Sequence, residues 1–181
     1  MPHTRPTPAP PPEPWHHPAC LPDEELLKQC TIQRGRASGP GGQHRNKVET
    51  EVQITHTPTG IQAHAGERRS QAENKRVALR RLRLALAINF RAAVPLGEIG
   101  SPLWRSRVRG GKIALNPDHH DYPSMLAEAM DVIAAANWDL RKAALRLDVT
   151  PTQLLRLIKD EPHALDRLNR ERAAIGLHPL R

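Results

Sequence analysis

A glycine-rich stretch around residue 41 holds the residues of this 181-residue chain whose types and spacing could perform chemistry. Gly39, Gly41 and Gly42 lack side chains, so the backbone there can adopt positive φ and come close to another molecule. Gln43 follows directly and offers a backbone N–H and an amide side chain. The stretch contains no Ser-His-Asp or Cys-His triad and no pair of carboxylates, which argues against covalent catalysis.

Positive charge surrounds this glycine-rich loop. Residues 34–112 contain 16 Lys and Arg against 5 Asp and Glu, residues 1–33 contain 2 against 4, and residues 113–181 contain 9 against 10. The net charge of +8 is therefore concentrated in the middle segment, where it indicates a polyanionic partner, with ordinary solubility as the alternative. The residues beside the loop that could face RNA phosphates are Arg34, Arg36, His44, Arg45 and Lys47.

The loop lies between predicted strands of a small α+β domain. From Cys30 onward, side chains of different polarity alternate weakly, as in a β-strand. In residues 48–65, apolar and polar residues alternate clearly on both sides of a Thr57–Gly60 turn, which predicts a β-hairpin. Residues 67–90 change to helical spacing, with leucines recurring on one face. We therefore expect a sheet of three to four strands covered by one long helix over residues 23–90.

The long helix has a second, basic face. Arg76, Arg80 and Arg83 recur at i, i+4 and i+7. Three unpaired arginines on one face repel each other, so we favour contact with a phosphate backbone over a solvated face. For Ser70 and Asn74, at the start of the helix, we favour capping and loop support over direct RNA contact. The remaining residues expected to contact RNA are Arg69, Gln71 and Lys75.

The other segments differ from this domain in composition. Residues 1–22 hold nine of the 18 prolines, which predicts a disordered or polyproline arm. Residues 91–122 are rich in Gly and Pro and predict a linker with Trp104 as an anchor. Residues 123–181 predict a second, all-α domain that contains a helix-turn-helix-like segment. The basic residues of the linker, which suit either an extended arm on RNA or a solvated segment, are Arg105, Arg107, Arg109 and Lys112.

Metal, disulfide and membrane chemistry are not indicated. Cys20 and Cys30 form no CxxC, and the His pairs at 16–17 and 119–120 read as loop residues, so we expect no zinc site and no cofactor. No apolar run approaches the roughly 18 residues of a membrane span, and the N-terminal residues lack a signal-peptide pattern. We expect a cytoplasmic location.

Two strings carry a resemblance to a known family. The sequences RASGPGGQHRNKVETEVQITHTPTGI, at residues 36–61, and RSQAENK, at residues 69–75, resemble the peptide-release domain of class I release factors. The resemblance implies that Gly41, Gly42 and Gln43 are catalytic and enter the peptidyl transferase centre, where water attacks the ester of peptidyl-tRNA. It also implies that the Gln43 N–H stabilises the developing oxyanion, that ribosomal RNA supplies the rest of the site, and that a Gln N5-methyltransferase modifies Gln43.

The chain departs from that family on either side of the resemblance. Codon-reading domains are not recognisable before residue 23, which suits the short rescue factors, but residues 113–181 lack the Lys/Arg-rich tail of that group. Residues 137–159 instead resemble the helix-turn-helix of Fis-type DNA-binding proteins, with Asp148 where glycine is usual. A packing or partner-docking role is the alternative to nucleic-acid contact there. The residues that would make such contact are Thr152, Gln153, Arg156 and Lys159.

These observations support one leading hypothesis and two alternatives. The leading hypothesis is a monomeric, ribosome-dependent peptidyl-tRNA hydrolase that acts without reading a codon and rescues stalled ribosomes. The first alternative is a non-catalytic ribosome- or RNA-binding module with a helix-turn-helix regulator domain. The second alternative is termination that depends on a stop codon.

Overall fold

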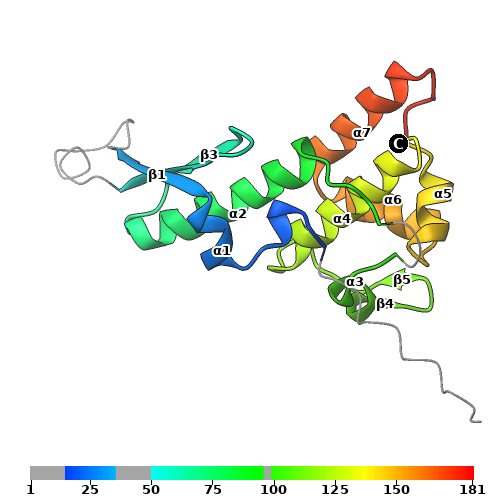
Figure 1. The fold of residues 1–181 in the computed structure, drawn as a ribbon, viewed down its shortest axis with the longest axis horizontal. Coiled ribbons are helices and arrows are strands. Elements are labelled where there is room, and N and C mark those ends of the chain that lie inside the picture. Colours follow the sequence, from blue (N-terminus) through cyan, green and yellow to red (C-terminus); the bar gives the residue numbers. More distant parts are fainter. Residues whose placement is uncertain (1–14, 36–49, 96–98) are drawn as a thin grey trace, which may run out of the picture.

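The computed structural model describes residues 15–35, 50–95 and 99–181 and shows an α+β fold (Figure 1). Strands β1 (Cys30–Gly35), β2 (Glu51–His56) and β3 (Gln62–Ala65) form an antiparallel sheet in that order. Side chains of β2 alternate between buried and half-buried, as the sequence pattern predicts. Helix α2 (Gln71–Asn89) covers the buried face, so the predicted hairpin and long helix are confirmed.

Helix α2 also joins the sheet to the C-terminal helices. Its far end is buried at Leu86, Ala87 and Ile88, and the helix packs along α4 (Tyr122–Ala135). Buried residues from the sheet, α2 and the C-terminal helices form one continuous apolar cluster. Helix α2 therefore links the sheet to the helical region through shared apolar packing, and the expected division into two small domains stays a prediction.

The C-terminal helices follow the sequence prediction closely. After α4 come α5 (Leu140–Arg146), α6 (Pro151–Lys159) and α7 (Pro162–Ala174). Thr150 caps α6 by accepting a hydrogen bond from the Gln153 N–H, and Pro151 occupies the first turn. In the part of the chain that the structure describes, no helix combines the length and apolarity needed to cross a membrane.

The turn between α5 and α6 places Asp148 in the left-handed region, with φ of 53°. A side chain is strained there, and glycine is not. Asp148→Gly should therefore raise the free energy of unfolding by about 0.5–1 kcal/mol, measured by urea denaturation. The matched control is Asp160→Gly, because Asp160 ends α6 with helical φ and ψ and gains nothing from glycine. Equal effects at both positions would contradict the strain explanation.

Residues 15–22 do not belong to a disordered arm. Trp15, His17 and Ala19 are buried against α2 and α4, and Pro18–Cys20 form a 3₁₀ helix (η1) before α1 (Asp23–Lys28). The Trp15 indole N–H donates to the buried carboxylate of Asp131 at 2.9 Å. Proline content misled the sequence prediction, because prolines also suit an extended segment laid over a core. The residues before Trp15 lie outside the described ranges.

Burial of His17 makes the fold sensitive to pH. Desolvation lowers the pKa of His17 from its ordinary 6.5 to about 4, although its ring contacts the Phe90 carbonyl at 3.3 Å. The unfolded chain therefore takes up a proton near pH 6.5, whereas the folded chain resists it until about pH 4. The stabilising contribution of neutral His17 is complete above pH 6.5 and is lost as the pH falls through that window.

Comparison with His17→Asn isolates this contribution. Burial raises the pKa of Asp131 to about 6, so protonation of Asp131 stabilises the fold as the pH falls from 6 to 4. This effect is opposite to that of His17, and it cancels because both proteins contain Asp131. We expect the stability difference between wild type and His17→Asn to shrink by about 3 kcal/mol between pH 7 and pH 4, measured by denaturant unfolding. A difference independent of pH would show that His17 is not neutral and buried.

Residues 99–122 are packed structure rather than the predicted linker. They contain α3 (Pro102–Arg107) and a small hairpin of β4 (Val108–Arg109) and β5 (Lys112–Ile113). Trp104 is buried, as its predicted anchoring role requires, and its indole N–H donates to the Leu147 carbonyl at 2.9 Å. The buried carboxylate of Glu128 accepts hydrogen bonds from the Ser101 N–H and hydroxyl. The Gly and Pro residues of this segment therefore mark tight turns, and the segment packs against α4 and the end of α5.

Candidate functional site

The catalytic loop predicted from the sequence begins and ends at one end of the three-stranded sheet. Strands β1 and β2 pair from Cys30–His56 to Gly35–Glu51, so the last pair lies where the intervening residues attach. In Figure 1 this end lies far from α5 and α6. The residues predicted for catalysis or RNA contact that fall outside the described ranges are Arg36, Gly41, Gly42, Gln43, His44, Arg45 and Lys47.

Asn74 fastens the chain where it re-enters the described structure after the loop. The Asn74 side chain is fully buried in the first turn of α2. Its amide NH₂ donates to the Thr50 carbonyl at 2.7 Å and to the Arg68 carbonyl at 2.9 Å, and its oxygen accepts from the Arg68 N–H at 2.9 Å. Asn74 therefore joins α2, the preceding turn and the residue next to β2. This confirms the loop-support prediction for Asn74.

Replacing Asn74 should weaken both the fold and the attachment of the loop. Asn74→Ala leaves one backbone N–H and two carbonyls without their partner, so we expect the free energy of unfolding to fall by about 2–3 kcal/mol. Ser70→Ala is the matched control, because the Ser70 side chain is exposed and makes no capping hydrogen bond, contrary to its predicted capping role. Denaturant unfolding of both variants measures the effect. Equal losses would contradict the assigned role of Asn74.

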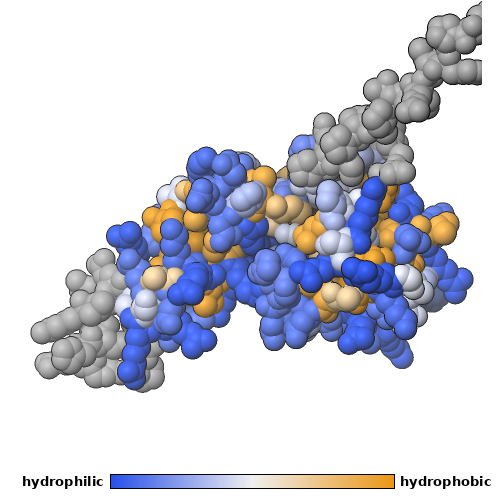
Figure 2. Space-filling model, turned by 90° about the horizontal axis from the view of Figure 1, so that it is seen from below, coloured by the Kyte–Doolittle hydropathy of each residue, from blue (hydrophilic) through white to orange (hydrophobic). Residues whose placement is uncertain are grey.

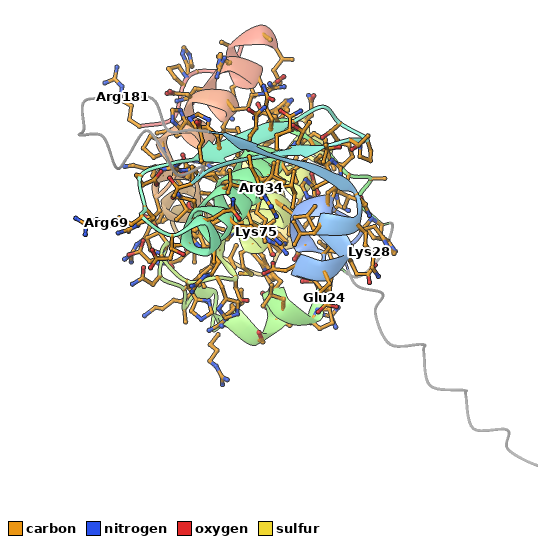
Figure 3. All side chains as sticks on the ribbon, turned by 90° about the vertical axis from the view of Figure 1, so that its left-hand side faces the viewer. Glu24, Lys28, Arg34, Arg69, Lys75 and Arg181 are labelled. Atoms are coloured by element: carbon orange, nitrogen blue, oxygen red, sulfur yellow. The ribbon has the colours of Figure 1, made fainter. Side chains whose placement is uncertain are left out.

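Exposed cations surround the same end of the molecule. Arg34 on β1, Arg69 before α2, and Lys75 and Arg76 in its first turns are all exposed, and none makes an ion pair with a residue of the described ranges. Figure 3 looks onto this end, with Arg34 and Lys75 near the centre and Arg69 at the edge. The half-buried Gln71 makes contacts within the chain. The four cations form a positive surface beside the ends of the loop.

Arg80 and Arg83, by contrast, are engaged within the chain. The Arg83 guanidinium donates to the Ala19 and Leu21 carbonyls at 2.5 Å and to Asp23 at 2.6 Å, and its side chain is 12% exposed. Arg80 donates to the carbonyls of Pro117 and His119. The sequence prediction that these arginines are unpaired is wrong at these two positions, which removes the reason for expecting them to contact RNA. Arg83 thereby holds residues 19–23 against α2, and Arg80 holds residues 117–119 against the same helix.

Two groups that could suggest other chemistry are satisfied in other ways. In the described part of the chain, the one cluster with metal-ligand types is His119, His120 and Asp121. The Arg107 guanidinium donates to Asp121 and lies 3.2 Å from the His119 ring, so it supplies the positive charge that a metal ion would bring. Burial raises the pKa of the Cys20 thiol to about 12, which keeps it protonated rather than nucleophilic.

Comparisons with known proteins match the sheet and α2. Residues 25–94 match the RF-1 domain family, and this range includes Gly41–Gln43 and Asn74. A 63-residue stretch, 35% of the chain, is 52% identical to peptide chain release factor 1 of Acidiphilium cryptum, of which it covers 18%. A 68-residue stretch, 38% of the chain, is 48% identical to the chloroplastic peptide chain release factor PrfB1 of Arabidopsis thaliana, of which it covers 14%.

A longer alignment reaches 100 residues. In it, 49% of the chain aligns at 41% identity with 28% of peptide chain release factor 1 of Variovorax paradoxus. The chain thus spans between about one seventh and just over one quarter of the length of these three relatives. The matched region is the region that holds the glycine-rich loop, its sheet and α2. Residues 25–94 of the chain are therefore release-factor-like and contain the Gly41–Gln43 triplet.

Proposed function

We propose that this protein hydrolyses the ester between a nascent peptide and its tRNA on the ribosome. The observation that carries the proposal is the RF-1 domain match over residues 25–94, which contains the Gly41–Gln43 triplet. The sheet supports it, because Gly35–Glu51 pairing attaches both ends of the intervening residues at one end of the molecule. Exposed cations at that end suit ribosomal RNA.

The proposed chemistry uses the ribosome as the larger part of the site. Gly41 and Gly42 permit close approach, and the Gln43 N–H donates a hydrogen bond to the oxyanion or to the leaving 3′-oxygen. The Gln43 side chain orients the attacking water. A general base on the protein is not required, because ribosomal RNA and the tRNA hydroxyl complete the site. Modification of Gln43 by a Gln N5-methyltransferase, and a monomeric state, remain predictions.

We further propose that release does not depend on a codon and serves the rescue of stalled ribosomes. Helices α4–α7 lie beyond the RF-1 match, and their core is continuous with that of α2. They would hold the GGQ domain rigidly and place it by contacts with the ribosome rather than with a triplet. The second candidate is stop-codon termination, which the names of the relatives favour.

One experiment separates these two candidates. The full chain is added to three particles that carry the same labelled peptidyl-tRNA: ribosomes with truncated mRNA, ribosomes with a stop codon in the A site, and free large subunits. Codon-independent rescue predicts release from truncated complexes at least as fast as from stop-codon complexes. Release that requires the stop codon would overturn the rescue proposal. The full chain is essential, because truncation after Phe90 would expose the apolar face of α2.

A further inference from the structure

The β4–β5 hairpin and α6 adjoin each other, far from the end of the sheet where Gly35 pairs with Glu51 (Figure 1). The Thr150 N–H donates to the Gly111 carbonyl at 3.1 Å, and the Ile113 N–H donates to the Gln153 side-chain oxygen at 3.2 Å. The hairpin turn therefore sits beside the first turn of α6. Gln153, which the sequence suggested for nucleic-acid contact, serves instead to hold this hairpin.

Five exposed cations lie along this surface. Arg109 and Lys112 face each other across the hairpin turn, and Arg156 and Lys159 continue along the exposed side of α6. Arg146, at the end of α5, lines a shallow pocket together with Val108 of β4, next to the α5–α6 turn. We call these cations the hairpin–α6 face: Arg109, Lys112, Arg146, Arg156 and Lys159.

The near-neutral charge count of residues 113–181 conceals this surface. Most acids of that segment are buried, cap a helix or pair with a cation. Glu128 and Asp131 are buried, and Asp121 pairs with Arg107. The acids that cap α5 and α7 or pair along a helix are Asp139, Glu161 and Glu171. The surface is therefore more positive than the segment's sequence total.

The cations of the hairpin–α6 face have no acidic partner among the described residues. None of the five makes an ion pair or a side-chain hydrogen bond there. The exposed acids near them are Asp148 in the α5–α6 turn and Asp160 at the end of α6. Five like charges beside these two exposed acids create a positive potential that favours a polyanion. Figure 2 views the molecule from the side of the β4–β5 hairpin, where hydrophilic residues surround smaller apolar patches on the right-hand lobe.

We propose that the hairpin–α6 face is a second RNA-binding surface, which grips the phosphate backbone without reading bases. Lys and Arg side chains without fixed partners suit phosphates, whose spacing varies along a folded RNA. The face lies at the far side of the molecule from the end of the sheet that carries the loop (Figure 1). The protein would thus hold RNA at two separated places, and α2 and α4 would set the distance between them. The inference does not rest on peptide release.

The test measures binding of the full chain to a fluorescent RNA duplex of about 20 base pairs at several salt concentrations. The test variant carries Arg109→Gln, Lys112→Gln, Arg156→Gln and Lys159→Gln. The matched control removes exposed charge elsewhere, with Lys28→Gln, Arg141→Gln, Arg170→Gln and Arg181→Gln. All substituted side chains are exposed, and unchanged thermal unfolding verifies that both variants fold.

We expect the test variant to bind RNA about tenfold to hundredfold more weakly, and the slope of log affinity against log salt to decrease by about 3. The control should keep most of its affinity. A charge-preserving variant, Arg156→Lys with Lys159→Arg, should bind like wild type. Equal losses in test variant and control, or no loss in the test variant, would overturn the proposal. Tighter binding to DNA of the same sequence would overturn the choice of RNA.

The same experiment distinguishes this proposal from the proposed function. Gly42→Ala, which should abolish peptide release, leaves the hairpin–α6 face unchanged and should bind the duplex with wild-type affinity. If wild type releases no peptide from any of the three particles while the test variant loses RNA affinity, the proposed function fails and the RNA surface stands. If the test variant keeps its RNA affinity while Gly42→Ala loses release, the RNA surface fails alone.

Discussion

Gln43→Pro should reduce the rate of peptide release by about 10²–10³-fold more than Gln43→Ala. Alanine keeps the backbone N–H at this position, whereas proline has none. If the N–H is the donor that stabilises the oxyanion, its loss removes the main contribution of the protein to the transition state. The measurement is single-turnover release of labelled peptide at saturating protein, which reports the chemical step.

Binding controls make this comparison interpretable. Affinity for the stalled ribosome is measured for both variants, since proline also restricts the backbone of the preceding residue. Both should bind within a few-fold of wild type, because the cations beside the sheet end are unchanged. Equal rate losses in the two variants would show that the amide side chain of Gln43, and not its N–H, carries the effect.

Trp15→Ala should lower the free energy of unfolding by about 3–5 kcal/mol. The Trp15 side chain is 8% exposed, and its removal leaves a cavity between the N-terminal segment and the helices. It also takes away the hydrogen-bond donor of Asp131, a fully buried carboxylate whose other partners are the Ala92 N–H and Arg91. A loss of this size would unfold much of a marginally stable protein at 37 °C.

Trp15→Phe separates packing from hydrogen bonding. Phenylalanine keeps most of the apolar volume but donates nothing to Asp131, so we expect a smaller loss of about 1–2 kcal/mol. Both variants are measured by urea denaturation at pH 7. A loss below about 0.5 kcal/mol for Trp15→Ala, the range of ordinary surface substitutions, would contradict the packing of residues 15–22 on α2 and α4.

Elements with a clear local period were predictable from the sequence. The alternation of β2 and β3 and the helical spacing of α2 appear in the structure at nearly the expected residues. The helical spacing expected after residues 140 and 151 likewise appears as α5 (Leu140–Arg146) and α6 (Pro151–Lys159). Each of these patterns depends on neighbours a few residues away, which is the range over which amphipathic spacing carries information.

Contacts between distant segments were not predictable in the same way. Arg83 reads locally as one member of a basic stripe, yet its donors are taken by carbonyls some 60 residues earlier. Trp15 pairs with Asp131 across 116 residues, and Trp104 with Leu147 across 43. Backbone acceptors leave no signature in the sequence. Composition alone therefore suggested an arm and a linker where the chain packs.

For the candidate site too, local patterns were predictable from the sequence and distant contacts were not. The residue types of Gly41–Gln43 and the resemblance around them pointed to the loop directly, whereas the three-bond role of Asn74 required the structure. The hairpin–α6 face was hidden for a different reason. A net charge sums buried, capping and exposed groups alike, and only the structure separates them.

The decisive measurement adds the full chain to ribosomes that are stalled on truncated mRNA and carry labelled peptidyl-tRNA. Wild type and Gly42→Ala are compared with a reaction that receives no protein. We expect wild type to release the peptide, and Gly42→Ala to stay near the background rate while it still binds the ribosome. Background release by wild type on these complexes, on stop-codon complexes and on free large subunits would contradict the hydrolase proposal.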